Sequence, residues 1–282
     1  MAAGHLGQTG PMSELRRRTL ASILDLVPAG EDRWVAPTPS EGPPRLFGGQ
    51  VAAQALSAAC RTVPSDRPPH SLHAYFIRPG RPDATLEMVV ERTRDGRSFT
   101  TRHVTAIQED KAIFNLTASF HAAEAGIDWQ VPAPEMTPPS EEEFTPAEPM
   151  FRAFWLASPF ELRPLRPDPE RHVAHPCWVR LVEDIPKEPA VQACALTFIS
   201  DMGVVASARA PDDRGRPASL ASLDHAVWFH RPFDMSEWHL LTVDPVSNSG
   251  ARGLARGTLH TSEGRLVASI AQEGLIRMPA PG

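Results

Sequence analysis

The sequence predicts an α+β protein built from two similar halves in tandem, each with one long apolar helix and an antiparallel sheet. Each half contains a helix-length run of small apolar residues followed by several strand-length runs. Short sequence echoes recur between the halves at nearly the same spacing, which indicates a duplication. A proline-rich acidic segment lies between the halves and marks their boundary.

The first half opens with a tail, residues 1–12, and a predicted helix that Ser13 caps and that ends near Gly30. Its apolar residues recur at helical spacing: Leu20, Ile23, Leu24 and Val27. Residues 48–63 predict a second helix, started by a glycine pair and stopped by Pro64. This second helix is nearly all alanine and other small apolar residues, so we expect other structure to wrap it.

Four strands follow this helix, separated by Pro-Gly, Asp-Gly and Glu-Asp turn signals. They are predicted at residues 70–79, 85–94, 98–108 and 111–120. In the last one, apolar residues alternate with Asn115, Thr117 and Ser119, as in an antiparallel strand with one buried face. The first half is therefore expected to be a buried helix followed by an antiparallel meander.

Residues 128–149 have no sustained period and many prolines and acids, which predicts an extended surface linker. We therefore predict an N-terminal domain at 1–127 and a C-terminal domain at 150–282. The second half repeats the order of the first, with a strand at 175–183 and an apolar helix at 189–208. Its later strands are predicted at residues 221–233, 238–246, 251–261 and 265–278.

The echoes pair SLHAYFIRP with SLDHAVWFHRP, and KAIFNLTASF with GRLVASIAQE. They match Ser71 with Ser222, and Ser119 with Gln272. Under the second match the last strands are out of phase, because Ile270 and Gln272 fall on the polar positions of the first half. Either the match slips by one residue or both faces of those strands are covered.

Composition excludes several classes of protein. The formal net charge is -6, which argues against a dedicated nucleic-acid binder. No apolar run is long enough to cross a bilayer, and the first residues resemble no secretory signal. Three separated cysteines, Cys60, Cys177 and Cys194, fit free thiols in a reducing compartment, so we expect a cytoplasmic protein. The histidines and cysteines form no metal-binding motif, and no cofactor is expected.

Three residues of the second half are candidates for chemistry. Asp201 lies in an apolar helical stretch, where a carboxylate must be hydrogen-bonded or have a raised pKa, unless it reaches water at the helix end. Gln272 occupies a strand position where an apolar residue is expected, and it serves either a bound water or an ordinary edge contact. Ser222 offers a hydroxyl at a strand start, where serine is common.

Other polar residues are weaker candidates. Asp224 and His225 are adjacent on a strand, so they face opposite sides and cannot easily serve one site. His230 and Arg231 are interpreted as residues at a strand end. The Gly48-Gly49 pair could present N–H groups to an anion or carbonyl, although a tight turn is the commoner reason for such a pair. The sequence contains no nucleophile elbow and no nucleotide-binding glycine motif.

Several segments together resemble the type II acyl-CoA thioesterases. These segments are FGGQVAAQALSAA, SLHAYFIRPG, ERTRDGRSFTTRHVTAIQ, ASLDHAVWFHRPF and VASIAQEGLIRM. The resemblance implies a double hotdog, in which each half wraps an antiparallel sheet around a long helix and the two sheets join. It also implies that an Asp, a Thr or Ser, and a Gln hold a nucleophilic water. These match Asp201 in FISDMG, Ser222 in ASLDHA and Gln272 in AQEG.

The function implied by this resemblance is hydrolysis of an acyl-CoA to a free fatty acid and CoA. Backbone N–H groups near Gly48-Gly49 or the second helix would stabilise the oxyanion. Arginines that could meet the CoA phosphates are Arg78, Arg231, Arg252 and Arg256. We further expect a homo-oligomer of double-hotdog subunits. The alternatives are a non-catalytic acyl-CoA-binding module and another hotdog reaction such as enoyl-CoA hydration, which would need an acid–histidine pair facing one pocket.

Overall fold

The computed structural model describes residues 18–39, 44–135, 137–139, 158–165, 176–210 and 218–278. The elements of the first half are α1 (Leu20–Ile23), β1 (Val27–Gly30), β2 (Arg33–Ala36), α2 (Gly48–Cys60), β3 (Pro69–Phe76), β4 (Leu86–Asp95), β5 (Phe99–Gln108) and β6 (Lys111–His121). Those of the second half are β7 (Phe160–Pro164), β8 (Cys177–Leu181), α4 (Pro189–Ser200), α5 (Val204–Ser207), β9 (Ser219–Ser222), β10 (Asp224–Phe229), β11 (His239–Ser249), β12 (Arg252–Thr261) and β13 (Leu266–Arg277).

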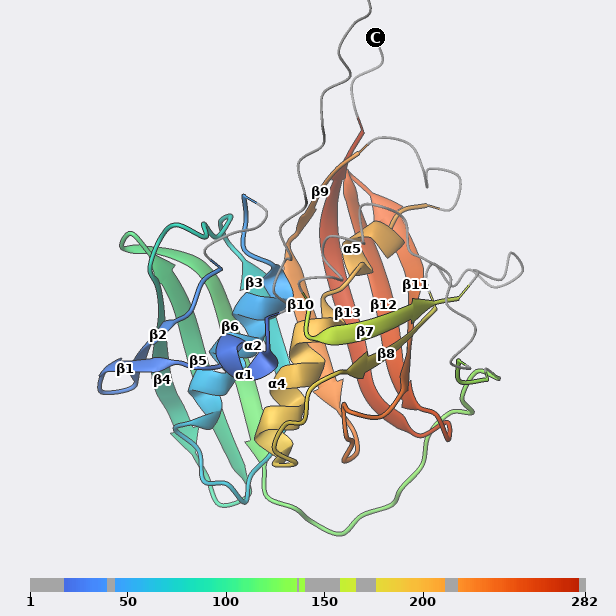
Figure 1. Ribbon diagram of the computed structural model, residues 1–282, viewed down its shortest axis with the longest axis horizontal. Helices are drawn as coiled ribbons and strands as arrows, with labels where there is room; N and C mark the ends of the chain where they lie inside the picture. The colour runs from blue at the N-terminus through green and yellow to red at the C-terminus, as the bar shows by residue number, and fades with distance from the viewer. Residues whose placement is uncertain are drawn as a thin grey trace, which may run out of the picture.

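The strands of these described segments form one continuous antiparallel sheet. Its order is β1-β2-β4-β5-β6-β3-β10-β13-β12-β11-β8-β7, with β9 paired to β13. Read inward from its two ends, this order runs through the same chain sequence in both halves, β1-β2-β4-β5-β6-β3 and β7-β8-β11-β12-β13-β10. The halves meet where β3 pairs with β10, with Tyr75 opposite Asp224 and Ser71 opposite Trp228. Figure 1 shows the result, two half-sheets side by side with α2 and α4 between them. The predicted double hotdog is confirmed.

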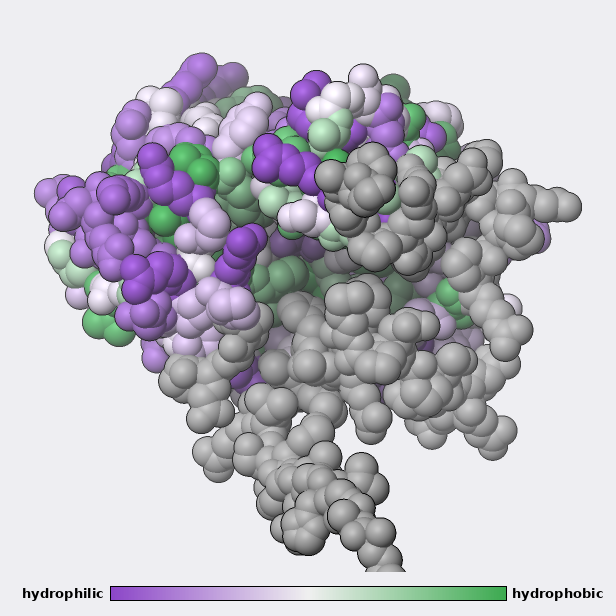
Figure 2. Space-filling view, turned by 90° about the horizontal axis from the view of Figure 1, so that it is seen from above, coloured by the Kyte–Doolittle hydropathy of each residue, from purple (hydrophilic) through white to green (hydrophobic). Residues whose placement is uncertain are grey.

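The small residues of α2 allow the two central helices to pack closely. Ala52, Ala55 and Ala59 are fully buried, and α2 packs against α4 and the sheet of its own half. Near the start of α2, the Phe47 ring meets Phe198 of α4 edge to face, with ring centroids 5.1 Å apart. Viewed from above, apolar surface is visible in the hollowed middle of the molecule, while the first half is mostly hydrophilic (Figure 2).

Two predicted helices are wrong in extent. Instead of one helix from Ser13 to Gly30, the chain forms the short α1, capped by Thr19, and then the strand β1. Pro28 explains the change, because proline lacks an N–H donor and disfavours helical backbone in the residue before it. Ser13 lies outside the described residues. The predicted helix at 189–208 is broken after Ser200, because Gly203 adopts a left-handed φ of 73° and separates α4 from α5.

The pairing of the strands shows how the residues of the two halves align with one another. Leu72 of β3 pairs with Ala118 of β6, and both are buried. Matching the shared Phe-x-Arg-Pro ends of β3 and β10 makes His225 the counterpart of Leu72. Continued by one residue, the register of β10 against β13 places His225 opposite Gln272, which makes Gln272 the counterpart of Ala118. The match therefore slips by one residue, and the second half has two polar residues where the first has two apolar ones.

The first part of the predicted linker is attached to the second half. Residues 122–135 form neither helix nor strand. Asp128 pairs with Arg231, and Gln130 bonds to the backbone of Gly264 and Leu266. We retain 128–149 as the proposed boundary between the domains, although residues 140–157 lie outside the described part of the chain.

Candidate active site

The three candidate residues meet at one point although they come from three separate elements. Asp201 is the C-cap of α4, Ser222 ends β9 and Gln272 lies within β13. The Gln272 amide nitrogen donates to Asp201 Oδ1 at 2.8 Å and to Ser222 Oγ at 2.9 Å. The folded chain therefore brings together the carboxylate, the hydroxyl and the amide that the sequence singled out.

Asp201 is buried, with 8% of its surface exposed. Burial raises the pKa of its carboxyl from the usual 3.8 to about 6, while hydrogen bonds from Gln272 and the Gly49 N–H act in the opposite direction. A carboxylate with this pKa is ionised at neutral pH and is a stronger base than an exposed aspartate. The Gly49 N–H lies in the first turn of α2, so the first half contributes directly to this site.

The glycine pair at the start of α2 is explained by close approach to α4. A Cβ on Gly48 would lie 2.6 Å from Asp201 Oδ2, and one on Gly49 would lie 2.2 Å from the carbonyl oxygen of Phe198. Both distances are far below ordinary contact, so neither position has room for a side chain. The pair brings the positive end of the α2 dipole against the Asp201 carboxylate, an arrangement that stabilises negative charge.

His225 also belongs to this site, although its strand pattern did not single it out as a site residue. As predicted, Asp224 and His225 face opposite sides: Asp224 accepts from the Glu273 N–H at 2.6 Å, whereas His225 points into the core. His225 Nδ1 lies 3.0 Å from Gln272 Oε1, and its Nε2 lies 2.8 Å from Ser200 Oγ. Burial lowers the pKa of His225 to about 4, despite an opposing hydrogen bond to Gln272, so the ring is neutral at physiological pH.

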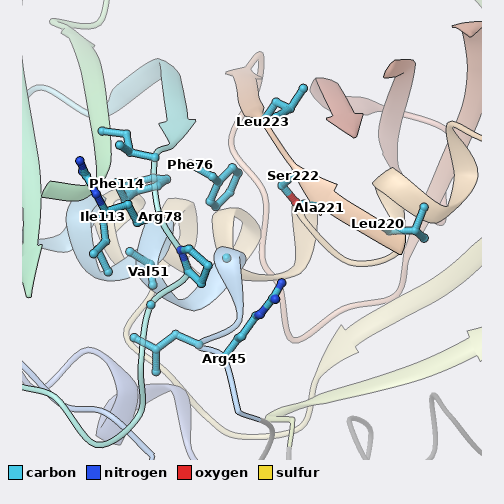
Figure 3. Close-up of a pocket in the computed structure, with 15 residues that line it drawn as sticks. Arg45, Val51, Phe76, Arg78, Ile113, Phe114, Leu220, Ala221, Ser222 and Leu223 are labelled. Atoms are coloured by element: carbon cyan, nitrogen blue, oxygen red, sulfur yellow. The ribbon is translucent and has the colours of Figure 1, made fainter. Parts of the chain in front are cut away.

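A pocket of about 390 Å³ lies beside these residues, between the halves. Gly48, Phe76 and Ser222 line it, together with apolar side chains that include Val51, Phe114 and Leu220. In Figure 3 the Arg45 side chain extends from the loop before α2 toward the strand that carries Ser222. Among the described residues, Arg45 forms no ion pair or hydrogen bond, which leaves its guanidinium available to a ligand.

The four arginines proposed from the sequence lie in different surroundings. Arg78 also lines the pocket, but its guanidinium donates to the carbonyl of Ala112. Arg231 is bonded to Asp128, and Arg252 pairs with Glu273. Arg256 is exposed on β12 and does not line the pocket. Arg45, which the sequence reasoning missed, is therefore the better placed cation.

The remaining sequence candidates have structural roles. His230 follows the end of β10 and bonds to Ser269, and Arg231 anchors the linker, which confirms their interpretation as strand-end residues. Cys60, Cys177 and Cys194 are free. Among the described residues, no group of three or more histidine, cysteine or acidic side chains is arranged to hold a metal ion. Within the same residues, no helix combines the length and the apolar composition needed to cross a membrane.

The fold and this polar network define the class of the protein: a double hotdog with an Asp–Ser–Gln cluster, in which Asp201 and Gln272 are buried, beside a pocket between its halves. Two family models match the chain, the acyl-CoA thioesterase N-terminal domain at residues 36–121 and acyl-CoA thioesterase at residues 165–275. The chain belongs to the acyl-CoA thioesterase family.

Relatives and solved structures agree with this assignment. The chain is 36% identical to acyl-CoA thioesterase 2 of Haemophilus influenzae, over 92% of this chain and 94% of the relative. It is 33% identical to human acyl-coenzyme A thioesterase 8, over 95% of this chain and 92% of the relative. The crystal structure of acyl-CoA thioesterase II TesB2 from Mycobacterium marinum matches with a TM-score of 0.78 and 36% identity, over 93% of this chain and 98% of that one. A hot dog fold protein from Alicyclobacillus acidocaldarius matches with a TM-score of 0.74 at 20% identity, which supports the fold alone.

Proposed function

We propose that this thioesterase hydrolyses acyl-CoA with a water molecule held and activated by Asp201, Ser222 and Gln272. The observation that carries the proposal is the convergence of Asp201 and Ser222 on the single amide nitrogen of Gln272, at 2.8 and 2.9 Å. The amide thereby joins a base of raised pKa to a hydroxyl that lines the pocket.

In this mechanism Asp201 is the general base. It removes a proton from the water as the water oxygen attacks the thioester carbonyl carbon. Collapse of the tetrahedral intermediate breaks the C–S bond and releases the CoA thiolate, and the proton held by Asp201 passes to the thiolate or to solvent. A thiolate is a comparatively good leaving group, so the reaction does not require a strong general acid.

The hydrogen bonds assign a role to each partner of Asp201. Ser222 Oγ accepts a bond from Gln272, so its own proton is free to bond to the water or the substrate in the pocket. The Gly49 N–H donates to Asp201, so it is already engaged in holding the base. Gly48 lines the pocket, and its N–H is the first-turn donor of α2 that we assign to the oxyanion.

The pocket suggests how the substrate lies. Its apolar walls suit an acyl or pantetheine chain, and Arg45 supplies a free positive charge for a CoA phosphate. Enoyl-CoA hydration is less well supported, because Asp224 and His225 face opposite sides and both ring nitrogens of His225 contact other side chains, Gln272 and Ser200. A binding module without activity would have no need for a buried base with a raised pKa.

The test is a panel of acyl-CoA substrates of varied chain length, in which free thiol release is followed for the wild type and Asp201→Asn. We expect the wild type to hydrolyse at least one substrate and the variant to be slower by about 10²–10⁴-fold, the range for loss of a general base. No thiol release from any member would favour the binding-module alternative. Equal turnover by both proteins would overturn the role of Asp201.

We also propose that the protein is cytoplasmic and assembles into a homo-oligomer. The three free cysteines support a reducing compartment. Fractionation of cells with an antibody against the chain tests the compartment, and recovery outside the cytosolic fraction would contradict it. Sedimentation of the purified protein tests the assembly, and a mass of 30.8 kDa would identify a monomer.

A further inference from the structure

Gln272 can serve the proposed site in only one of its two amide orientations. Its nitrogen has two N–H donors, and both are used, one on Asp201 and one on Ser222. A half-turn of the amide would place Oε1 against the Asp201 carboxylate and leave the Ser222 oxygen without its donor. The orientation of this amide therefore decides whether the base and the hydroxyl are held at all.

The partner of the other end of the amide is His225. Its Nδ1 lies 3.0 Å from Gln272 Oε1, and a carbonyl oxygen can only accept, so Nδ1 must carry the ring proton. The other ring nitrogen of a neutral imidazole is then an acceptor. It lies 2.8 Å from the Ser200 hydroxyl oxygen, which also lies 2.9 Å from the Thr197 carbonyl oxygen, so the one proton of this hydroxyl has two acceptors within reach.

We propose that His225 is a positioning residue, which locks the amide orientation of Gln272 through its Nδ1–H. This inference rests on the proposed function of Gln272. His225 is 1% exposed, and its two ring nitrogens face Gln272 Oε1 and Ser200 Oγ, so it acts through Gln272 and does not meet the substrate. His225 is also neutral at physiological pH, because burial lowers its pKa to about 4, so it has no charge to offer the reaction.

The first half provides an internal comparison. The positions equivalent to His225 and Gln272 are Leu72 and Ala118, which are 0% exposed. The same strand pair thus packs well with two apolar residues, and a core position in this fold does not require histidine. A buried polar group is unfavourable unless its hydrogen bonds are satisfied, and His225 meets this condition through its bonds to Gln272 and Ser200.

Two variants of His225 separate positioning from packing. In His225→Asn the amide N–H lies close to the place of Nδ1, so it can still donate to Gln272. In His225→Gln the longer side chain carries its amide toward Ser200, near the place of Nε2, so the donation to Gln272 is lost. Both replace imidazole with a buried amide, which makes them matched controls for the polarity of the core.

We expect kcat of His225→Gln to fall by about 10- to 100-fold, because misplacing a catalytic group by about 1 Å can cost about 10²-fold. Its KM should change by less than about two-fold, since no substrate contact is removed. His225→Asn should keep kcat within about three-fold of the wild type. Equal loss of kcat in the two variants, or no loss in either, would overturn the inference.

Two controls keep the result interpretable. If neither His225 variant folds, Ser200→Ala removes the hydroxyl that contacts the other ring nitrogen of His225 and helps to hold the ring, and an unchanged kcat in that variant would overturn the inference. The wild type and Asp201→Asn are measured in the same assay. Failure of the proposed function would appear as no thiol release by the wild type, or as equal turnover by Asp201→Asn. Failure of the positioning role would appear with the wild type active and Asp201→Asn impaired.

Discussion

At the scale of single residues, the site is organised around a carboxylate that is costly to bury. Asp201 lies at the end of an apolar helix, and burial shifts its pKa toward neutrality. Two donors, the Gln272 amide and the Gly49 N–H, keep it ionised enough to act as a base. The balance between desolvation and these hydrogen bonds sets the pH range of the proposed reaction.

The pH dependence of hydrolysis follows from this pKa. The base must be ionised, so kcat/KM should fall as pH drops below about 6, where the Asp201 carboxyl gains a proton. Stopped-time assays of thiol release between pH 4.5 and 8 measure this decrease in kcat/KM. In Asp201→Asn most of the activity should be lost, and the remaining kcat/KM should no longer decrease below pH 6. If kcat/KM of the wild type decreased only near pH 4, as expected for an exposed aspartate, the raised pKa of Asp201 would be contradicted.

At the scale of elements, the start of α2 packs closely against the end of α4, and this contact links the two halves. The two glycines let the helix N-terminus approach the Asp201 carboxylate and the Phe198 carbonyl. The left-handed Gly203, two residues after Asp201, separates α4 from α5. One helix thus presents the acid, and the other presents its N–H donor.

Gly49→Ala tests the close contact between α2 and α4. The added methyl would lie 2.2 Å from the Phe198 carbonyl oxygen, so α2 must move away from α4. We expect a loss of stability of about 1–3 kcal/mol, the usual range for overpacking, together with a marked fall in kcat. Denaturant unfolding and the thiol assay measure the two effects. Ala58→Gly, far along the same helix, is the matched control and should lower stability by about 1 kcal/mol while kcat is kept. Full activity in Gly49→Ala would show that the close approach is not needed.

At the scale of the whole molecule, the two halves have the same strand order, but the proposed site occurs once. The sheet order is the same in both halves, and each half supplies one central helix. The polar residues lie in the second half, with Leu72 and Ala118 at the matching positions of the first. The first half contributes the start of α2 and most of the pocket wall, so the site needs both halves.

The free energy of unfolding should also depend on the protonation of the buried Asp201 carboxyl. The native pKa of Asp201 is raised to about 6 from 3.8, so the folded state binds a proton more tightly than the unfolded state. This contribution to stability is therefore lost as pH rises from about 4 to about 6. Above that window, Asp201→Asn should be more stable than the wild type by about 1–3 kcal/mol. Urea unfolding at pH 8 measures the difference. A less stable variant at pH 8 would indicate that the hydrogen bonds outweigh desolvation.

Much of the site was predictable from single residues. Asp201 and Gln272 stand out because each is a polar residue where the pattern expects an apolar one, and the family resemblance added Ser222. His225 gave no such signal, because its alternation with Asp224 is ordinary for a strand with one exposed face. Arg45 was also missed, since a lone arginine before a helix is usually an exposed charge. Its position at the pocket depends on a strand from the other half of the chain.

The sequence by itself determined the α+β class, the two repeated halves and the apolar central helices, because these depend on local periodicity and on short echoes. Tertiary structure alone decided the one-residue register of β13, the break between α4 and α5, and the β1–β2 hairpin. It also decided that the α2 N-terminus meets Asp201 and that His225 meets Gln272. These contacts join residues far apart in the chain, so their distances are fixed by strand pairing and helix packing, which local sequence patterns do not encode.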